Sequence, residues 1–296
     1  MAKVKTFKTI FPAVSVPLND DYSINEPEFR AYLRWIKSFY GKGIEGLVCN
    51  GHTGEITGLT RAERKRVVEI CSEECGDVMT IISGVNCENT AESIAMAKEA
   101  KEAGADGILL MPPHMWLRFG MNPNAPFEYV KDVAEGADID IIIHLYPATS
   151  KAFYPVETLI KMCKEIDHVK CIKMGTRVTS IYEHDVRLLR QECPDISLIT
   201  CHDETLCVSW FPGMDGALIG FAGCVPELIC PAWDVFKNPD KHTLKEAQDW
   251  SNRIYHISQA IYGGGQPSGE AHARLKEALK QRGIFTSALM RKPVLP

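Results

Sequence analysis

The sequence predicts an α/β protein, a (β/α)8 TIM barrel with a C-terminal helical extension. Eight short apolar runs recur along the chain, and amphipathic stretches of helical character lie between them. The runs are continuously apolar rather than alternating, as in parallel strands covered by helices on both faces. Eight strand–helix units within roughly 220 residues match such a barrel. The alternative is a doubly wound open sheet, but the segment after the first run, Val16-Pro-Leu-Asn-Asp20, lacks the Gly-rich dinucleotide fingerprint of that fold.

In chain order, the expected strands are Thr9–Val16, Gly46–Asn50, Thr80–Gly84, Gly107–Met111, Ile139–His144, Lys170–Lys173, Ser197–Cys201 and Gly216–Gly220. The clearest amphipathic helices between them are Thr60–Glu74, Thr90–Ala103, Pro155–Glu165 and Ile181–Cys193. Gly43, Gly104 and Gly213 each follow a helical stretch. At such positions a left-handed backbone favours glycine, so they mark expected helix ends.

Beyond the eighth strand, residues 226–282 look helical, with breaks near Asn238-Pro239 and Gly263-Gly-Gly265. These breaks predict two or three helices. We therefore expect a barrel domain over residues 1–225 and a helical extension over residues 226–296.

Composition excludes several classes of function. The chain of 296 residues carries 33 basic and 38 acidic residues, a net charge of −5, and no basic run dense enough for nucleic acid or an anionic membrane. No segment reaches the roughly 18 apolar residues of a membrane span, and the first residues lack the apolar stretch of a signal peptide. The eleven cysteines follow no repeated spacing. Reduced thiols in a cytoplasmic protein are the expected state.

Barrel enzymes carry their chemistry at the carboxyl ends of the strands. Four of the nine histidines fall at this rim: His52, His114, His144 and His202. Lys173 ends the sixth expected strand, where burial lowers the pKa of an amine and leaves it nucleophilic toward ketones. His144 ends the strand before it and is suited to move the protons that such chemistry needs. This pairing predicts an enzyme that acts on carbonyl compounds through a Schiff base.

The turn Gly51-His-Thr-Gly-Glu55 joins a strand to a helix. Its backbone N–H groups can form a nest for a carboxylate or phosphate, with Thr53 as an added hydroxyl donor. An ordinary capped turn with Thr53 as N-cap is the alternative. His114 and His202 are weaker candidates for substrate contact, and Arg118 and Arg177 are candidate clamps for a second carboxylate.

Together these residues resemble the dihydrodipicolinate synthase / N-acetylneuraminate lyase family over nearly the whole chain. The likeness rests on the turn Gly51–Glu55, the spacing from Pro147 to Lys173, the segment Gly213–Gly223, and the ending Arg274-Leu-Lys-Glu-Ala-Leu…Arg291-Lys-Pro-Val-Leu-Pro296. The resemblance implies a Schiff base on Lys173, a carboxylate-binding hydroxyl on Thr53 and a backbone contact near Leu218. It implies no cofactor, because the lysine supplies the electrophile, and a homo-oligomer, either tetramer or dimer.

The chain also departs from the family pattern. With Pro147 aligned, the family's proton-relaying tyrosine falls on His144, and Tyr146 is nearby but out of register. His52 replaces the first hydroxyl residue of the turn. The arginine by which dihydrodipicolinate synthases hold their second substrate falls near Thr149, so a true dihydrodipicolinate synthase is not expected.

The loop His114–Phe127 looks longer and more aromatic than is usual in the family. It contains Trp116 and Phe119. This suggests a different and bulkier second substrate.

The resulting hypothesis is a Schiff-base-forming lyase, an aldolase or dehydratase, that acts on pyruvate or a related 2-oxo acid, with an aldehyde as a candidate co-substrate. Cleavage, condensation and dehydration all remain open. One alternative is a metal-dependent barrel hydrolase that uses the rim histidines with Asp203 and Glu204, although no compact ligand spacing appears, so no metal site is expected. Another is a 2-oxo-acid sensor that has lost turnover.

Overall fold

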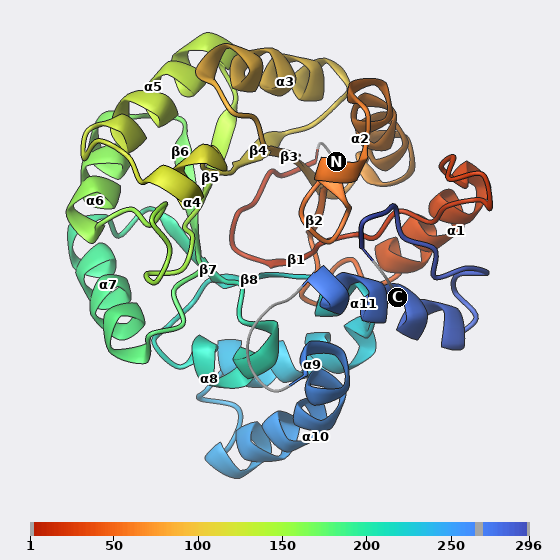
Figure 1. The fold of residues 1–296 in the computed structure, drawn as a ribbon. Coiled ribbons are helices and arrows are strands. Elements are labelled where there is room, and N and C mark those ends of the chain that lie inside the picture. The colour runs from red at the N-terminus through yellow and green to blue at the C-terminus, as the bar shows by residue number, and fades with distance from the viewer. Residues whose placement is uncertain (1–2, 264–268, 295–296) are drawn as a thin grey trace.

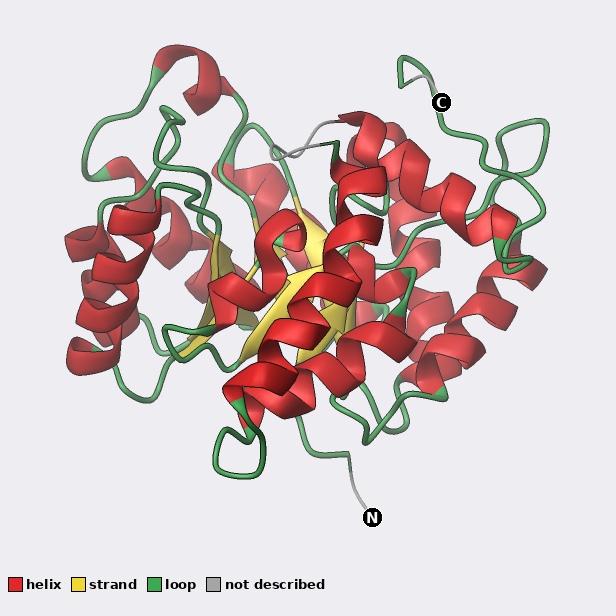
Figure 2. Cartoon of the chain, turned by 90° about the horizontal axis from the view of Figure 1, so that it is seen from below, coloured by secondary structure: helices red, strands yellow, loops and turns green. Residues whose placement is uncertain are grey.

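The computed structural model describes residues 3–263 and 269–294. Eight parallel strands form one sheet in the order β1-β8-β7-β6-β5-β4-β3-β2. Parallel bridges from Ile10 to Ile44 and from Ala13 to Val48 bring the first strand against the second and nearly close the barrel. Helices surround the strands on all sides (Figures 1 and 2). The predicted TIM barrel with a C-terminal helical extension is confirmed.

The strands are β1 (Ile10–Pro12), β2 (Gly46–Cys49), β3 (Thr80–Val85), β4 (Gly107–Leu110), β5 (Asp140–His144), β6 (Val169–Met174), β7 (Ser197–Thr200) and β8 (Gly216–Ile219). The helices are α1 (Glu26–Lys37), α2 (Arg61–Cys75), α3 (Thr90–Glu102), α4 (Met115–Phe119), α5 (Ala125–Ala137), α6 (Val156–Glu165), α7 (Thr179–Glu192), α8 (Leu206–Trp210), α9 (Pro226–Lys237), α10 (Leu244–Tyr262) and α11 (Gly269–Gln281).

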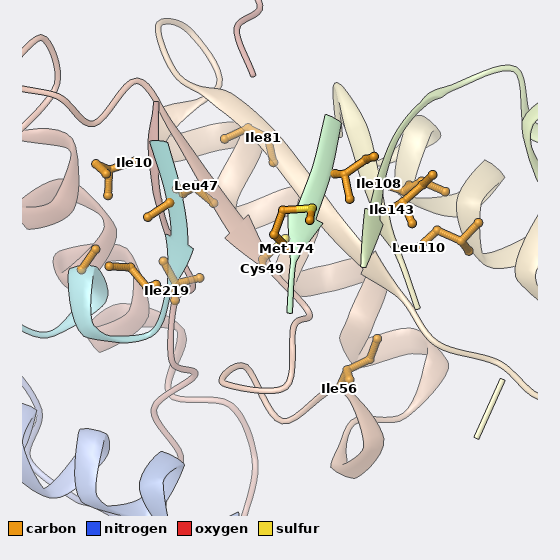
Figure 3. Close-up of a cluster of buried hydrophobic side chains, with 14 of the residues drawn as sticks. Ile10, Leu47, Cys49, Ile56, Ile81, Ile108, Leu110, Ile143, Met174 and Ile219 are labelled. Atoms are coloured by element: carbon orange, nitrogen blue, oxygen red, sulfur yellow. The ribbon is translucent and has the colours of Figure 1, made fainter. Parts of the chain in front are cut away.

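Each strand is apolar on both faces because it separates two hydrophobic clusters. On β5, Ile141 and Ile143 pack outward against the helices, in the cluster of Figure 3, whereas Ile142 belongs to the cluster inside the barrel. Successive side chains of a strand point to opposite faces, so this alternation decides which residues reach the interior. His144 and Tyr146 continue the inward series that Ile142 begins.

Two expectations about element ends need correction. The first strand is much shorter than the expected Thr9–Val16, since only Ile10–Pro12 pair in register with β8. The chain nevertheless stays extended, with the N–H of Ala13 and of Val14 bonded to carbonyls of the two neighbouring strands. The loop expected after the fourth strand contains the short helix α4 and the first residues of α5.

The expected helix ends agree with the structure in part: Gly104 comes directly after the C-cap of α3, whereas Gly43 lies five residues beyond Ser38, the C-cap of α1. Gly43, Gly104 and Gly213 all have positive φ, at 107°, 101° and 92°. Helix α9 ends just before Asn238, and α10 ends just before Gly263. The remaining two glycines of the predicted break, at 264 and 265, lie outside the described residues. The expected domain boundary falls at Val225, immediately before α9, and stays a prediction.

A buried ion pair fastens helix α11 to the barrel. The Lys276 ammonium pairs with Glu55 of the turn after β2, and the two side chains are only 1% and 8% exposed. Lys276 also donates to the carbonyl of Leu289 at 2.8 Å, and Glu55 accepts the N–H of Arg291 at 3.0 Å. The same pair therefore holds both α11 and the tail that follows it.

We expect Lys276→Met to destabilise the fold by about 3 kcal/mol, because it leaves the Glu55 carboxylate buried without its counter-charge. Urea denaturation measures this as a lower midpoint. Adding Glu55→Gln should recover part of the loss, since an amide needs no counter-charge. Lys245→Met is the control: its pair with Asp249 is exposed, so the expected change is below about 0.5 kcal/mol. Equal losses in the two lysine variants would contradict the role given to the buried pair.

Candidate active site

A cavity of about 200 Å³ lies at the carboxyl ends of the strands. Five of the seven predicted site residues line it: Lys173, His144, Thr53, His52 and Leu218. They come from four strands or the turns that follow them. The fold therefore brings together residues up to 166 positions apart, from His52 to Leu218.

Lys173 is next to the last residue of β6 and lies beside His144 of β5 in the parallel register. Within the described residues, its ammonium nitrogen has no hydrogen-bond or ion-pair partner. Burial lowers the pKa of Lys173, while Cys201 and Asp203 act in the opposite direction. A lowered pKa increases the fraction of neutral amine, which is the form that attacks a carbonyl.

His144 is 7% exposed, and its Nδ1 is buried without a hydrogen-bond partner. Burial, reinforced by the positive charge of Lys173, lowers the pKa of His144 well below its usual value. The imidazole is therefore neutral at neutral pH. A neutral imidazole at this place can accept a proton from a substrate bound to Lys173.

Tyr146 also lines the cavity, although it is out of register with the tyrosine of the family pattern. The chain stays extended past His144, because the N–H of Leu145 bonds to the carbonyl of Lys173 at 3.1 Å. Tyr146 consequently points inward like His144, and their rings meet edge to face at 5.0 Å between centroids. Burial raises the pKa of Tyr146, so its phenol keeps its proton.

The Tyr146 hydroxyl lies 3.2 Å from Nε2 of His52 and 3.4 Å from Nε2 of His114. His52 lines the cavity, whereas His114 lies behind it, toward the rim. Burial lowers the pKa of His52 to about 3, with a smaller effect from Lys173. Tyr146 therefore connects a cavity histidine to one outside the cavity.

The turn after β2 offers unused donors to the cavity. Thr53 is 9% exposed and does not cap the next helix; Thr60 does so, in a capping box with Glu63. The alternative role of Thr53 as an N-cap is thus wrong. In the part of the chain that the structure describes, the backbone N–H groups of residues 52–54 have no protein acceptor. Such a group of free donors suits a carboxylate.

Arg177 borders the cavity but is already paired. Its guanidinium bonds to the carboxylate of Glu204 and to the carbonyl of Gly175, the latter at 2.9 Å. Glu204 is buried, so the pair is protected from water. The other candidate clamp, Arg118, does not line the cavity. Neither arginine therefore offers the cavity an unpaired guanidinium that could bind a second carboxylate.

Asp203 lies in the cavity beside this pair. Burial raises the pKa of its carboxyl to about 6, although the N–H of Phe221 donates to it at 2.8 Å and favours the ionised form. The sequence offered Asp203 as a weaker candidate for lining the pocket and, in the alternative function, as a metal ligand. The structure places it near Lys173.

His202 does not join Lys173. It lines a second cavity of about 380 Å³, which shares only Arg177 with the first. Its ring lies 4.8 Å from that of Tyr182, and burial lowers the pKa of His202 to about 3. Cys201 and Asp203 point into the barrel on either side, so the strand alternation turns His202 outward.

The aromatic loop after β4 also lies apart from the cavity. Trp116 packs edge to face against Tyr129 and Tyr154, and Phe119 is 76% exposed. Neither lines the space around Lys173. The loop therefore gives no reason to expect a bulkier second substrate.

Three cavity residues come from the C-terminal helices and were missed in the sequence: Tyr262, Ala271 and His272. Burial, with a further effect of Lys173, lowers the pKa of His272 to about 4. The sequence gives little sign of these three residues, because no pattern near them in the chain places α10 or α11 at the ends of the strands. The Glu55–Lys276 pair makes that link in three dimensions.

The family model of the dihydrodipicolinate synthetase family matches residues 6–296. The chain belongs to this family. The resemblance inferred from the motifs is thereby confirmed, and the chain is a lyase of the class I aldolase type that such members represent.

Relatives of the family span the full chain. An uncharacterized DapA-like lyase of Pyrococcus horikoshii is 29% identical over 97% of this chain and 93% of its own. The 4-hydroxy-tetrahydrodipicolinate synthase of Bartonella bacilliformis is 25% identical over 98% and 92%. Among solved structures, YagE of E. coli K12 in complex with pyruvate has a TM-score of 0.87 at 20% identity, covering 99% and 94%. This last likeness supports the fold.

The metal-dependent hydrolase is not favoured by these findings. The described residues contain no group of three His, Cys, Asp or Glu side chains that could hold a metal ion. Instead, His202 faces a separate cavity and Glu204 binds Arg177. Among the described helices, none is long and apolar enough to cross a membrane.

Proposed function

We propose that this protein forms a Schiff base between Lys173 and pyruvate, or a related 2-oxo acid, and makes or breaks a bond next to the resulting imine. The observation that supports this most is the unpaired amine of Lys173, with its lowered pKa, beside His144 in the cavity at the strand ends. The pyruvate complex of YagE supports the choice of substrate. The protein resembles dihydrodipicolinate synthases without being one.

The proposed chemistry assigns one task to each side of the cavity. The substrate carboxylate accepts from the free N–H groups of the Thr53 turn and from the Thr53 hydroxyl. The neutral Lys173 amine attacks the ketone carbon, and loss of water gives the imine. Once protonated, the imine withdraws electrons, so a proton or a carbon–carbon bond beta to its nitrogen can break. His144 gives or takes the proton at that carbon.

The second substrate in this proposal is a neutral aldehyde. Arg177 is committed to Glu204, and position 149, where synthases carry an arginine, is Thr149. A second carboxylate would therefore enter a small, buried space without a free guanidinium to meet it. Burying an unpaired charge is unfavourable, which argues against a second substrate that is itself an acid.

We further propose a cytoplasmic homo-oligomer, either tetramer or dimer. The family resemblance supports assembly, and so does the exposure of two large apolar side chains at the second cavity, Val208 at 59% and Phe211 at 62%. A reducing compartment agrees with the cysteines, of which all eleven are free thiols in the described residues.

The lysine role predicts a trapped adduct. Incubation with pyruvate and borohydride should reduce the imine to a stable amine on Lys173, seen by peptide mass spectrometry. Lys173→Arg should abolish the adduct and lower turnover by at least about 1,000-fold, because the nucleophile is gone. Lys170→Arg is the control, as Lys170 lies exposed on the same strand. No adduct with any 2-oxo acid would remove the proposal, whereas an adduct without turnover on any aldehyde would favour the sensor.

For His144 we expect His144→Phe to lower turnover by about 100-fold, the usual contribution of a positioned acid–base group, while the borohydride adduct still forms. The pKa of His144 lies well below 6.5, so its base form is present at neutral pH and is lost only in acid. In His144→Tyr the acid limb of the kcat profile should move to higher pH, because a phenol titrates near pH 10. Unchanged turnover in His144→Phe would end its proposed role.

A panel of aldehydes tests the second substrate. We expect neutral aldehydes to exceed aspartate semialdehyde in kcat/KM by at least about tenfold, which corresponds to about 1.4 kcal/mol for an unpaired carboxylate. Glu204→Gln removes the negative charge that holds Arg177. It should therefore reduce the difference in kcat/KM between neutral aldehydes and aspartate semialdehyde. A preference for aspartate semialdehyde in the unmodified enzyme would contradict the proposal.

A further inference from the structure

Three side chains form a continuous row from the cavity to the rim: His52, Tyr146 and His114. The two imidazoles approach the Tyr146 hydroxyl at 3.2 and 3.4 Å, both through Nε2. Asn86 continues the row, with its Nδ2 3.2 Å from Nε2 of His114. Substrate binding to His52 and His114, as the sequence suggested, does not explain why a buried phenol joins them.

The donors and acceptors of this row fix where its protons lie. The Asn86 amide nitrogen can only donate, so Nε2 of His114 accepts and carries no proton. The Tyr146 hydroxyl also donates to this nitrogen, so the two donors share its one lone pair. The phenol oxygen in turn accepts from Nε2–H of His52, which leaves Nδ1 of His52 bare in the neutral ring. The hydrogen bonds from His52 to Tyr146 and from Tyr146 to His114 therefore point from the cavity toward the rim, whereas Asn86 donates to His114 from the opposite side.

We propose that this row is a proton relay, in which Tyr146 passes protons between His52 at the cavity and His114 at the rim. The inference rests on the proposed Schiff-base function and names the exit for the proton that this chemistry releases. Tyr146 is a positioning residue here, because it acts through the two histidines rather than on the substrate.

The transfer balances in protons and electrons. A proton leaves the carbon beta to the imine nitrogen for the neutral ring of His144 and crosses from there to Nδ1 of His52, while the electron pair of the broken C–H bond forms the enamine. Nε2–H of His52 passes to the Tyr146 oxygen, and the Tyr146 proton passes to Nε2 of His114. His52 and Tyr146 end neutral, His114 ends as an imidazolium, and water at the rim takes up its extra proton. The reverse sequence delivers a proton to the enamine.

The electrostatics of the two ends favour this direction. Around His52 lie Lys173 and His272, both of which disfavour a lasting positive charge on its ring. At the other end, the exposed Glu88 carboxylate accepts the backbone N–H groups of His114 and Met115 at 3.2 and 2.9 Å. A positive charge on His114 thus has an anion nearby.

His144 lacks such an exit. Its Nδ1 is enclosed without a partner, and within the described residues no hydrogen bond links its ring to the surface. A proton that His144 takes from the substrate must therefore return to the cavity or cross to a neighbouring group. His52 lies 5.5 Å away between ring centroids and opens onto the same space.

Tyr146→Phe tests the relay, because it removes the hydroxyl and keeps the ring. Two steps are measured: borohydride trapping of the pyruvate imine, and exchange of the pyruvate methyl protons in D₂O followed by NMR. We expect trapping to stay within about twofold of the parent and exchange to slow by about 100-fold. Added imidazole or formate buffer should restore exchange in a concentration-dependent manner, since a small base can replace a lost relay. His114→Gln should reproduce this pattern.

Tyr129→Phe is the matched control. It removes another buried hydroxyl, bonded to Ser93 and to the carbonyl of Met111, outside the cavity. Its trapping and exchange should both match the parent. Normal exchange in Tyr146→Phe would overturn the relay, and so would a parallel loss of trapping and exchange that buffer does not rescue. Failure of trapping in the parent enzyme would instead refute the Schiff base itself, so the two failures are distinguishable.

Discussion

The burial of one unpaired amine is the constraint on which the cavity depends. A charged ammonium is costly to keep inside a barrel, so Lys173 has a lowered pKa, and every imidazole around it is kept from charging by the same burial. The strong opposite charges at the border, Arg177 and Glu204, neutralise each other. When the substrate enters the cavity, its carboxylate is then the first charge there that no neighbouring side chain neutralises. Free backbone donors, rather than a side-chain cation, are arranged to receive it.

Strand geometry explains why these groups converge. The inward series on β5 and its continuation places His144 and Tyr146 on one side of the cavity, and the parallel register with β6 sets Lys173 directly beside His144. No special loop conformation is needed for either relation. The chemistry of the cavity is therefore specified mainly by regular secondary structure, which holds side chains more rigidly than loops do.

Sequence patterns could predict the barrel and its reactive lysine because both depend on local order. Continuous apolar runs mark the strands, and Lys173 and His144 end two of them. The sequence left the direction of Tyr146 open, and the extended chain past His144 decides it. His202 lies outside the cavity, because its outward direction depends on which neighbours the barrel encloses. Arg177 was a candidate clamp for a carboxylate, but it binds Glu204, a choice that only packing decides. Tyr262 and His272 reach the cavity through long-range contacts that no local pattern records.

The buried pair of Glu55 and Lys276 has a consequence for how the protein is made. On the ribosome the strands emerge first, and β2 with its turn is complete more than 200 residues before α11 leaves the exit tunnel. Until then the Glu55 side chain lacks its ammonium partner and the wall that His272 supplies is missing. A chain without α11 therefore lacks one wall of the cavity, and water that enters there favours the charged form of the Lys173 amine over the neutral, nucleophilic one.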